Sequence, residues 1–98
     1  MTIWGNSKMT TLYYSDDSAA LDFPCVVKID DKHIIVEYED DGAKQYCGPN
    51  NGTDHFELKA TDGDGHASLH RFPDSIILEG SWKEGGVRGM WKIKLEKN

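Results

Sequence analysis

Hydrophobic and polar residues alternate along most of the chain, and dipeptides that favour tight turns interrupt this alternation every ten to twelve residues. Asn-Gly, Asp-Gly and Gly-Gly supply the positive φ angles that two-residue hairpin loops need, and Gly-Asp suits the related form with one positive φ. The pattern therefore predicts antiparallel hairpins joined in one meander. The predicted turns are Asp31-Lys32, Asp41-Gly42, Asn51-Gly52, Gly63-Asp64, Pro73-Asp74 and Gly85-Gly86.

Each two-residue turn also fixes which residues face each other across its hairpin. In the last hairpin Trp82 faces Gly89 and Gly80 faces Trp91, so each large ring lies over a position without a side chain. The other turns pair Val27 with Val36, Val36 with Cys47, Tyr38 with Gln45, Phe56 with Arg71, and Leu69 with Leu78. One inward row is then Cys25, Tyr38, Gln45, Leu58, Leu69, Leu78 and Ile93, and a neighbouring row of small residues, Ala43, Ala60, Ala67 and Gly80, ends at Trp91.

The remaining chain adds one strand and one short helical turn. Residues 8–14 are rich in Thr and Tyr, which favours a strand. Residues 16–22 predict a helical turn with a Ser or Asp cap, ended by Pro24. The fold class is thus all-β, with about eight strands in an up-and-down meander that forms a small barrel or a strongly curled sheet over a single domain, residues 1–98. Because a barrel requires shear, at least one ideal register must break at a bulge.

This architecture resembles the calycin group of small barrels, which includes lipocalins and avidin-like proteins. The resemblance rests on eight antiparallel strands in simple order, on the predicted helical crossing after the first strand, and on a Gly-x-Trp motif, present here as Gly80-Ser81-Trp82 and Gly89-Met90-Trp91. In lipocalins the motif lies on the first strand, whereas here it occurs on the last two, and Ile3-Trp4-Gly5 has the reverse order. The resemblance implies a ligand carrier, by analogy of fold and without matched binding residues.

Charge and composition narrow the partners. The chain has 11 Lys and Arg against 17 Asp and Glu, a net charge of −6, which repels phosphate backbones and anionic membranes. We therefore expect an acidic protein that binds neither nucleic acid nor membrane. Residues 1–6 show neither a basic segment nor an apolar run, so we expect no signal peptide and a cytoplasmic location.

Cysteine and histidine positions argue against a disulfide, a metal site or a cofactor. In the predicted register Cys25 and Cys47 both point inward but lie about 12 Å apart, beyond the roughly 7 Å limit for a disulfide, which predicts two free, buried thiols. His66 and His70 share a strand face but stand about 13 Å apart, too far to bind one ion. We expect no metal ligands and no cofactor.

The predicted inward face carries few groups for chemistry. No nucleophile with a base, phosphate loop or inward pair of carboxylates emerges, so we expect no enzymatic activity. Arg71 is directed inward, where a guanidinium needs a partner, and it could bind a ligand carboxylate there. Alternatively it could snorkel to water or stack on Phe56, or the strand could slip at a bulge so that Phe72 points inward instead. The candidate ligand-binding residues are Arg71, Gln45, Tyr38, Trp91 and Trp82.

Two functions from different classes remain open at this point. The first is a carrier of a small apolar or anionic ligand inside the barrel. The second is a non-catalytic interaction or homodimerisation module with a filled core, which would use apolar residues of the outer face. The candidate interface residues are Ile77, Met90, Ile35, Tyr46 and Val26.

Overall fold

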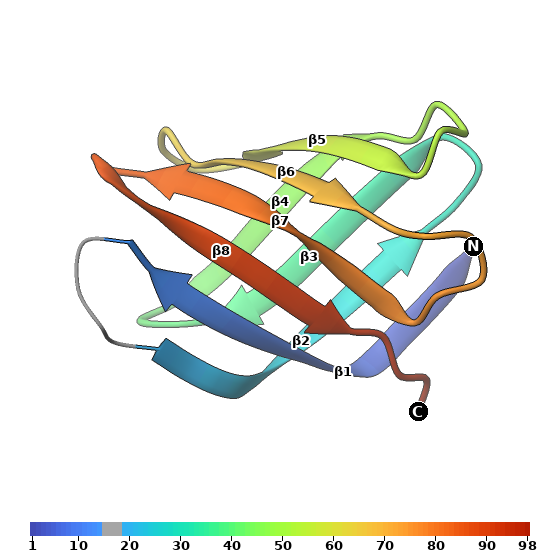
Figure 1. Cartoon of the computed structure of the whole chain (residues 1–98), viewed down its shortest axis with the longest axis horizontal. Coiled ribbons are helices and arrows are strands. Elements are labelled where there is room, and N and C mark those ends of the chain that lie inside the picture. The colour runs from blue at the N-terminus through green and yellow to red at the C-terminus, as the bar shows by residue number, and fades with distance from the viewer. Residues whose placement is uncertain (15–18) are drawn as a thin grey trace.

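The alternating pattern produces strands that bury one face and expose the other, and these strands close on themselves. The computed structural model describes residues 1–14 and 19–98. Eight antiparallel strands follow one another around a closed barrel in chain order (Figure 1). They are β1 (Thr2–Tyr13), β2 (Ala19–Ile29), β3 (His33–Glu39), β4 (Ala43–Pro49), β5 (His55–Ala60), β6 (His66–His70), β7 (Ile77–Glu84) and β8 (Val87–Lys94). The all-β meander predicted from the sequence is confirmed.

The N-terminal part of the chain differs from the prediction. Strand β1 begins at Thr2, so it is longer than the strand predicted over residues 8–14. Strand β2 begins at Ala19, so residues 19–22 of the predicted helical turn are strand, and residues 16–18 lie outside the described residues. No helix occurs among the described residues, and hence none long and apolar enough to cross a membrane.

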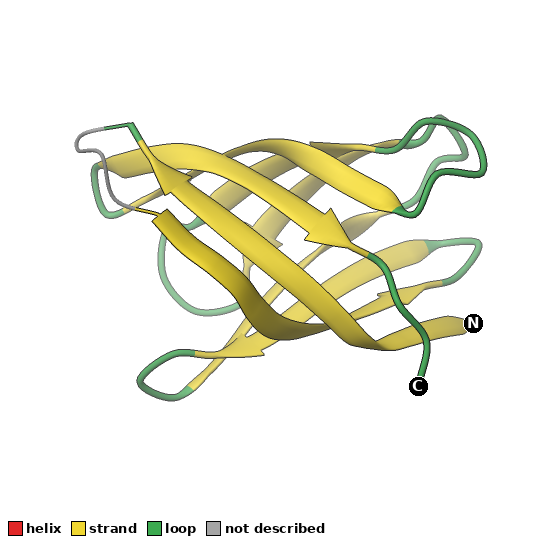
Figure 2. Ribbon diagram, turned by 60° about the horizontal axis from the view of Figure 1, so that its bottom comes forward, coloured by secondary structure: helices red, strands yellow, loops and turns green. Residues whose placement is uncertain are grey.

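Strand β1 closes the barrel because it pairs on both sides. Residues 2–12 pair with β2 on one side, and residues 8–13 pair with β8 on the other (Figure 2). The β1–β2 register shifts between Trp4 and Ser7 and again between Met9 and Thr11. These irregularities supply the break in ideal pairing that closure was expected to require.

Two of the predicted registers are correct. In the β7–β8 hairpin Gly80 pairs with Trp91 and Trp82 with Gly89, as expected for a two-residue turn. Both turn glycines have positive φ, 58° at Gly85 and 80° at Gly86, as a type I′ turn requires. The β2–β3 hairpin likewise pairs Ile29 with Ile34 and Val27 with Val36.

The β3–β4 register was wrong by one residue, which inverts a strand. Glu39 pairs with Ala43, so the loop has three residues, 40–42, rather than two. Val36 consequently pairs with Tyr46 and not with Cys47. Because side chains alternate, Tyr46 turns into the barrel while Gln45, Cys47 and Ala43 turn away from the interior.

The next three registers were wrong by more than one residue. Strands β4 and β5 pair Tyr46 with Ala60, because the loop between them is longer than the Asn51-Gly52 turn. Strands β5 and β6 pair Phe56 with Leu69, and β6 and β7 pair Leu69 with Gly80, each displaced by two residues. A shift of two keeps every side chain on its predicted face, so β5, β6 and β7 still bury the expected residues.

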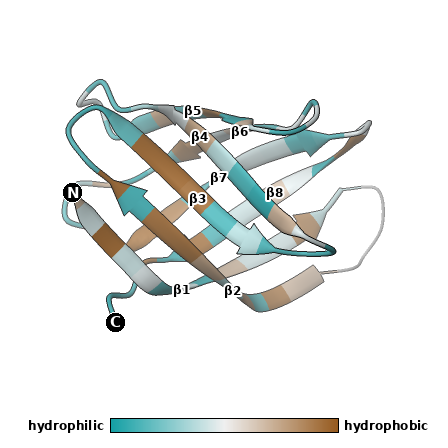
Figure 3. Cartoon of the chain, turned by 180° about the vertical axis from the view of Figure 1, so that it is seen from behind, coloured by the Kyte–Doolittle hydropathy of each residue, from teal (hydrophilic) through white to brown (hydrophobic). Residues whose placement is uncertain are grey.

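The interior below the ends of the barrel is solid. Apolar side chains from all eight strands fill it, and hydrophobic and hydrophilic segments succeed one another along the strands (Figure 3). On the outer face Lys28 and Glu37 form an ion pair of 2.8 Å between β2 and β3. The buried apolar residues are Met9, Cys25, Val27, Ile34, Val36, Tyr46, Phe56, Leu58, Ala67, Leu69, Leu78, Trp82, Trp91, Ile93 and Leu95.

Glycines in β7 and β8 allow neighbouring strands to approach closely. A Cβ atom on Gly80 would lie 1.7 Å from the Ser68 carbonyl oxygen of β6, and one on Gly89 would lie 1.7 Å from the Leu12 carbonyl oxygen of β1. Backbone of the next strand, more than the facing ring, therefore excludes a side chain at Gly80. At Gly89 the indole nitrogen of Trp82 is also close, at 3.1 Å.

Candidate binding pocket at the barrel mouth

The β3–β4, β5–β6 and β7–β8 turns gather at one end of the barrel, which we call the mouth. The two chain termini lie at the other end (Figure 1). The mouth contains a pocket of about 260 Å³. Its lining comes from β1, β2, β3, β7 and β8 and from the turn after β3: Met9, Thr11, Tyr13, Ala20, Phe23, Tyr38, Asp40, Trp82, Glu84, Val87 and Trp91.

Five aromatic rings line the pocket, and they pack against one another either stacked or edge-on. Trp82 and Trp91 stack at 24° with centroids 6.1 Å apart. Tyr13 packs edge-on against Trp82 at 5.5 Å, and Tyr38 packs edge-on against Trp91 at 6.1 Å. Phe23 in turn packs edge-on against Tyr38 at 6.3 Å. Each ring is held by another, so the wall is formed before any ligand arrives.

The small inward residues explain why the large rings fit at this end. Ala67 faces Trp82 and Gly80 faces Trp91 across the sheet. Tyr46 faces Ala60 and packs edge-on against Trp91 at 5.0 Å, beneath the pocket. Trp91 thus does two things: it fills the core below and forms part of the pocket wall above.

The pocket has a negative electrostatic character. Its two charged lining residues are Asp40, which is exposed, and Glu84, which is half-buried. Burial first, and then the negative charges of Glu84 and Asp40, raise the pKa of Tyr38 to about 12. Burial and Glu84 also raise the pKa of Tyr46, whose hydroxyl has no hydrogen-bond partner among the described residues. Both tyrosines therefore remain neutral donors at physiological pH.

The turn that follows Glu84 is anchored at the mouth. The Gly85 backbone N–H donates to the Asp64 carboxylate at 3.1 Å, which joins the β7–β8 turn to the β5–β6 turn. This contact fixes the end of β7 against a neighbouring turn. Glu84 consequently occupies a defined position beside the pocket.

Three of the five predicted ligand-binding residues meet in this pocket: Tyr38, Trp82 and Trp91. Gln45 does not, because the β3–β4 register places it on the outer face, where its amide donates to Glu37 at 3.4 Å. A wider hollow of about 600 Å³ includes Gln45 and one edge of Tyr38, but charged residues rather than rings supply much of its lining.

Arg71 lies at the opposite end of the barrel from the pocket. Strand β6 ends at His70, and the Arg71 backbone N–H donates to Asp54 O at 2.9 Å. Its guanidinium lies 5.7 Å from the Trp4 ring centroid and donates to Ser75 O at 2.7 Å. The predicted pairing of Arg71 with Phe56 was wrong, because Phe56 pairs with Leu69, and the Arg71 guanidinium lies over the Trp4 ring instead.

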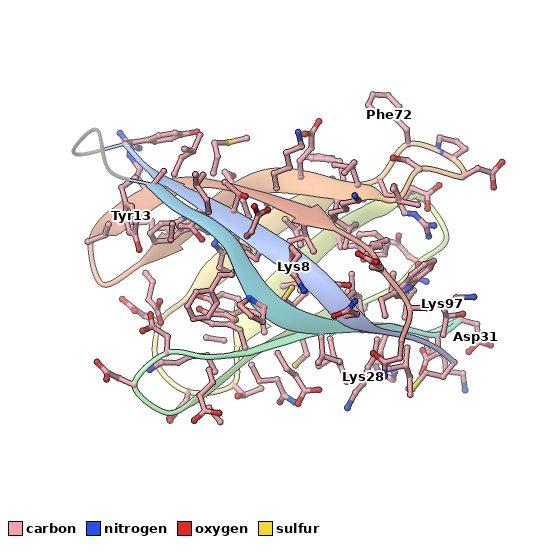
Figure 4. The ribbon with its side chains drawn as sticks, turned by 90° about the horizontal axis from the view of Figure 1, so that it is seen from below. Lys8, Tyr13, Lys28, Asp31, Phe72 and Lys97 are labelled. Carbon is pink, nitrogen blue, oxygen red and sulfur yellow. The ribbon has the colours of Figure 1, made fainter. Side chains whose placement is uncertain are left out.

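The predicted interface residues do not form one surface. Tyr46 is buried in the core, because the β3–β4 loop has three residues. Val26 and Ile35 are half-buried on the outer face of β2 and β3. Ile77 and Met90 line a separate hollow of about 460 Å³ on β7 and β8, beside Phe72, which is 78% exposed and projects away from the barrel (Figure 4).

Histidines pair on the outer surface in a way that the predicted register did not bring out. The two-residue shift places His55 opposite His70, with Nδ1 atoms 3.0 Å apart. The other ring nitrogen of His55 lies 3.1 Å from Glu57, whose carboxylate accepts a hydrogen bond from the Ser68 hydroxyl. Three or more such ligands do not gather around a metal position anywhere in the described part of the chain.

The two cysteines are free, as predicted, but only one is buried. Cys25 points inward, and burial raises the pKa of its thiol to about 12, against a smaller opposing effect of Lys8. Cys47 is half-buried on the outer face, opposite Ile35. The expectation that both thiols point inward was wrong for Cys47, again because of the three-residue β3–β4 loop.

Several pocket residues were missed from the sequence. Met9, Thr11 and Tyr13 alternate along β1 with polar or exposed residues, a period-two pattern that marks one strand face. Asp40 and Glu84 end β3 and β7 next to turns, and only barrel closure brings these two positions together. The alternation was readable in the sequence, but the convergence of the acidic residues was not.

Comparisons with known proteins returned no match to a family model, to a curated protein or to a solved structure.

Proposed function

We propose that this protein binds a small, largely apolar molecule in the mouth pocket. The preformed wall of rings around Trp82 and Trp91 is the observation that carries the proposal. Ligand sites are typically concave, mostly apolar and formed before binding, with a few polar groups that orient the ligand. The calycin-like architecture favours the same role, because small closed barrels hold ligands at their mouths.

The pocket restricts the size of its ligand. Its volume of about 260 Å³ lies below the roughly 300–1,000 Å³ of sites for drug-sized molecules. Trp91 lines the pocket and packs against buried Tyr46, so buried rings limit how far a ligand can enter the barrel. We therefore propose a ligand of one ring or a short branched chain.

The charge of the lining favours the apolar class over the anionic class of ligand. The anionic hypothesis depended on Arg71, which lies at the far end of the barrel. Asp40 and Glu84 would repel a ligand carboxylate in the mouth pocket. The proposal therefore excludes an anionic ligand from this site.

Tryptophan emission tests the proposal directly. Of the three tryptophans, Trp4 lies away from the pocket, so Trp4→Phe leaves Trp82 and Trp91 as reporters. In that background we expect small neutral aromatic molecules to change the emission saturably. Ala20→Phe places a ring into the pocket and should abolish the change, whereas Ala19→Phe, at an exposed neighbouring position, should preserve it. Equal binding by both variants would place the ligand elsewhere.

A second candidate function is protein interaction through the outer face of β7 and β8. The observation that favours it is the hollow beside Ile77 and Met90, next to the exposed ring of Phe72. Clustered apolar side chains on a protein surface mark interfaces more often than single exposed apolar side chains do. Light scattering of the parent and of Ile77→Lys with Met90→Lys tests it: a dimer that becomes monomeric in the double variant supports this function. A parent that is monomeric at all concentrations removes the homodimer.

A further inference from the structure

The ring-lined pocket has acidic residues and no basic residue on its described lining. Resting on the ligand-binding function proposed above, we propose that the ligand of the mouth pocket carries a positively charged ammonium group, held among the aromatic rings of the wall with Glu84 and Asp40 as counter-charges. The inference names the chemical class of the ligand, an amine with an apolar body. It is drawn from ring geometry, the positions of the two carboxylates and the absence of cations on the wall.

The rings present the right surface to a cation. Trp82 and Trp91 lie within 24° of parallel, while Tyr13 and Tyr38 stand against them at 88° and 81°. A cation within about 6 Å of a ring centroid is attracted by the negative face of the ring, most strongly by Trp. Because Trp82 and Trp91 are themselves buried, the half-buried rings of Tyr13, Phe23 and Tyr38 supply most of the aromatic surface that an ammonium group could contact.

The basic side chains near the mouth do not line the pocket, although exposed Lys44 pairs with Tyr38 at the edge of the mouth. Lys83 pairs with Arg88 across the β7–β8 hairpin, and both are exposed on the outer face. Lys92 is exposed in the same way further along β8. No Lys, Arg or His of the described chain lines the pocket, so its two carboxylates are not neutralised by a neighbour within it.

The two carboxylates come from different strands and converge on one space. Asp40 follows β3 and Glu84 ends β7, and the charges of both reach the Tyr38 hydroxyl, whose pKa they raise. A concave site with charges of one sign and apolar walls concentrates the field in its opening. An ammonium group would pair with these carboxylates, and it would remain close to water through exposed Asp40.

The pairing of each cation with an uncharged isostere makes the test specific. The Trp4→Phe protein is titrated with choline and with benzyltrimethylammonium, and separately with their isosteres in which carbon replaces the charged nitrogen. We expect each cation to bind at least about tenfold more tightly than its isostere, since desolvated cation–π contacts and counter-charges act together. Added salt should weaken the binding of the cations and leave the binding of their isosteres unchanged.

Variants separate the acidic residues from the rings. Glu84→Gln and Asp40→Asn should each weaken cation binding several-fold and leave the isosteres unchanged. Glu79→Gln, the same charge change at an exposed outer position of β7, is the matched control and should change neither. Trp91→Phe should weaken both classes of ligand, because its ring contributes apolar surface as well as a π face.

The outcomes distinguish this inference from the proposed function. Isosteres that bind as tightly as the cations, or cation binding that Glu84→Gln and Asp40→Asn leave intact, would overturn the ammonium inference and retain an apolar site. If neither cations nor isosteres bind, the pocket has no ligand of this size and both proposals fall. Tight cation binding that responds to both acidic residues supports both.

Discussion

Gly80→Ala should destabilise the barrel severely, although it adds a single methyl group. The new Cβ atom would lie 1.7 Å from the Ser68 carbonyl oxygen, whereas real contacts of this kind do not fall below 3.0 Å. Strand β6 must therefore move by about the difference, 1.3 Å, or β7 must bend away from it. Neither movement is easy, because β6 and β7 are paired from residue 66 to residue 70 and the core behind Leu69 is full.

The cost follows from overpacking and from weakened pairing. Forcing extra atoms into a packed region typically costs about 1–3 kcal/mol. Loss of one or two backbone hydrogen bonds adds about 0.5–1.5 kcal/mol each. We therefore expect a loss of about 2–4 kcal/mol from a total that is about 5–15 kcal/mol for a domain of this size. The melting temperature should fall on the order of 10–25 °C.

Thermal and urea unfolding, followed by circular dichroism, measure this loss. Gly52→Asn is the control, since nothing lies within 4 Å of a Cβ atom at Gly52 and Asn accepts its positive φ of 81°. The control should change stability by less than about 1 kcal/mol. If Gly80→Ala melts within a few degrees of the control, β6 and β7 are not as close as described, and the steric account of Gly80 is refuted.

Three further predictions test other parts of the structure. Iodoacetamide should modify Cys47 in the folded protein while Cys25, with its raised pKa and buried thiol, reacts only on unfolding; mass spectrometry that finds both labelled at equal rates would contradict the assigned faces. Arg71→Ala should cost about 1–2 kcal/mol of stability, through lost stacking on Trp4 and one lost hydrogen bond, and leave binding at the mouth unchanged; weaker ligand binding would restore Arg71 to the site. The pKa of Tyr38 is about 12 in the folded protein and about 10 when unfolded, so the stability that its neutral hydroxyl contributes is complete below pH 10 and is lost as the pH rises toward 12. In urea unfolding at increasing pH, Tyr38→Phe should flatten this alkaline decline of the free energy of unfolding. An unchanged decline in the variant would assign it to other groups.

The parts of the fold that could be predicted are the hairpins whose turn residues specify the turn type and its length. Gly85 and Gly86 both adopt positive φ, so the last hairpin has one register and its Gly-Trp pairs follow. The Asp31-Lys32 turn carries a weaker signal, but the Asp30 carboxylate accepts hydrogen bonds from the backbone N–H groups of Lys32 and His33 at 2.8 and 2.6 Å. These bonds hold the turn that the sequence predicts.

The failures come from loops whose length the sequence does not state. Asp41 and Gly42 both have positive φ, 53° and 114°, which fits a two-residue turn as readily as the three-residue loop that occurs. One extra residue moved Gln45 and Cys47 outward and Tyr46 inward. The loops after β5 and β6 exceed the prediction by an even number, so faces survived there and only the facing partners changed.

The mouth pocket shows why faces can be predicted where sites cannot. Tyr38, Trp82 and Trp91 were correctly expected inside, because the β2–β3 and β7–β8 registers that fix their faces were predicted correctly. Glu84 and Asp40 line one pocket only because β1 closes the barrel. The first residues of β1 were not predicted as a strand, so this closure could not be placed from the sequence. The prediction that Arg71 belongs to the ligand site was wrong in position, because Arg71 lies at the end of the barrel opposite the pocket.

The two acidic residues of the pocket bear on the function of this end of the barrel. Asp40 and Glu84 line the pocket without a basic residue on the described wall, and their charges raise the pKa of Tyr38. On the outer face of β2 and β3, by contrast, Glu37 is paired with Lys28. Unpaired carboxylates above a wall of tryptophan rings therefore support a binding site, and the charge that would pair with them is a positive one.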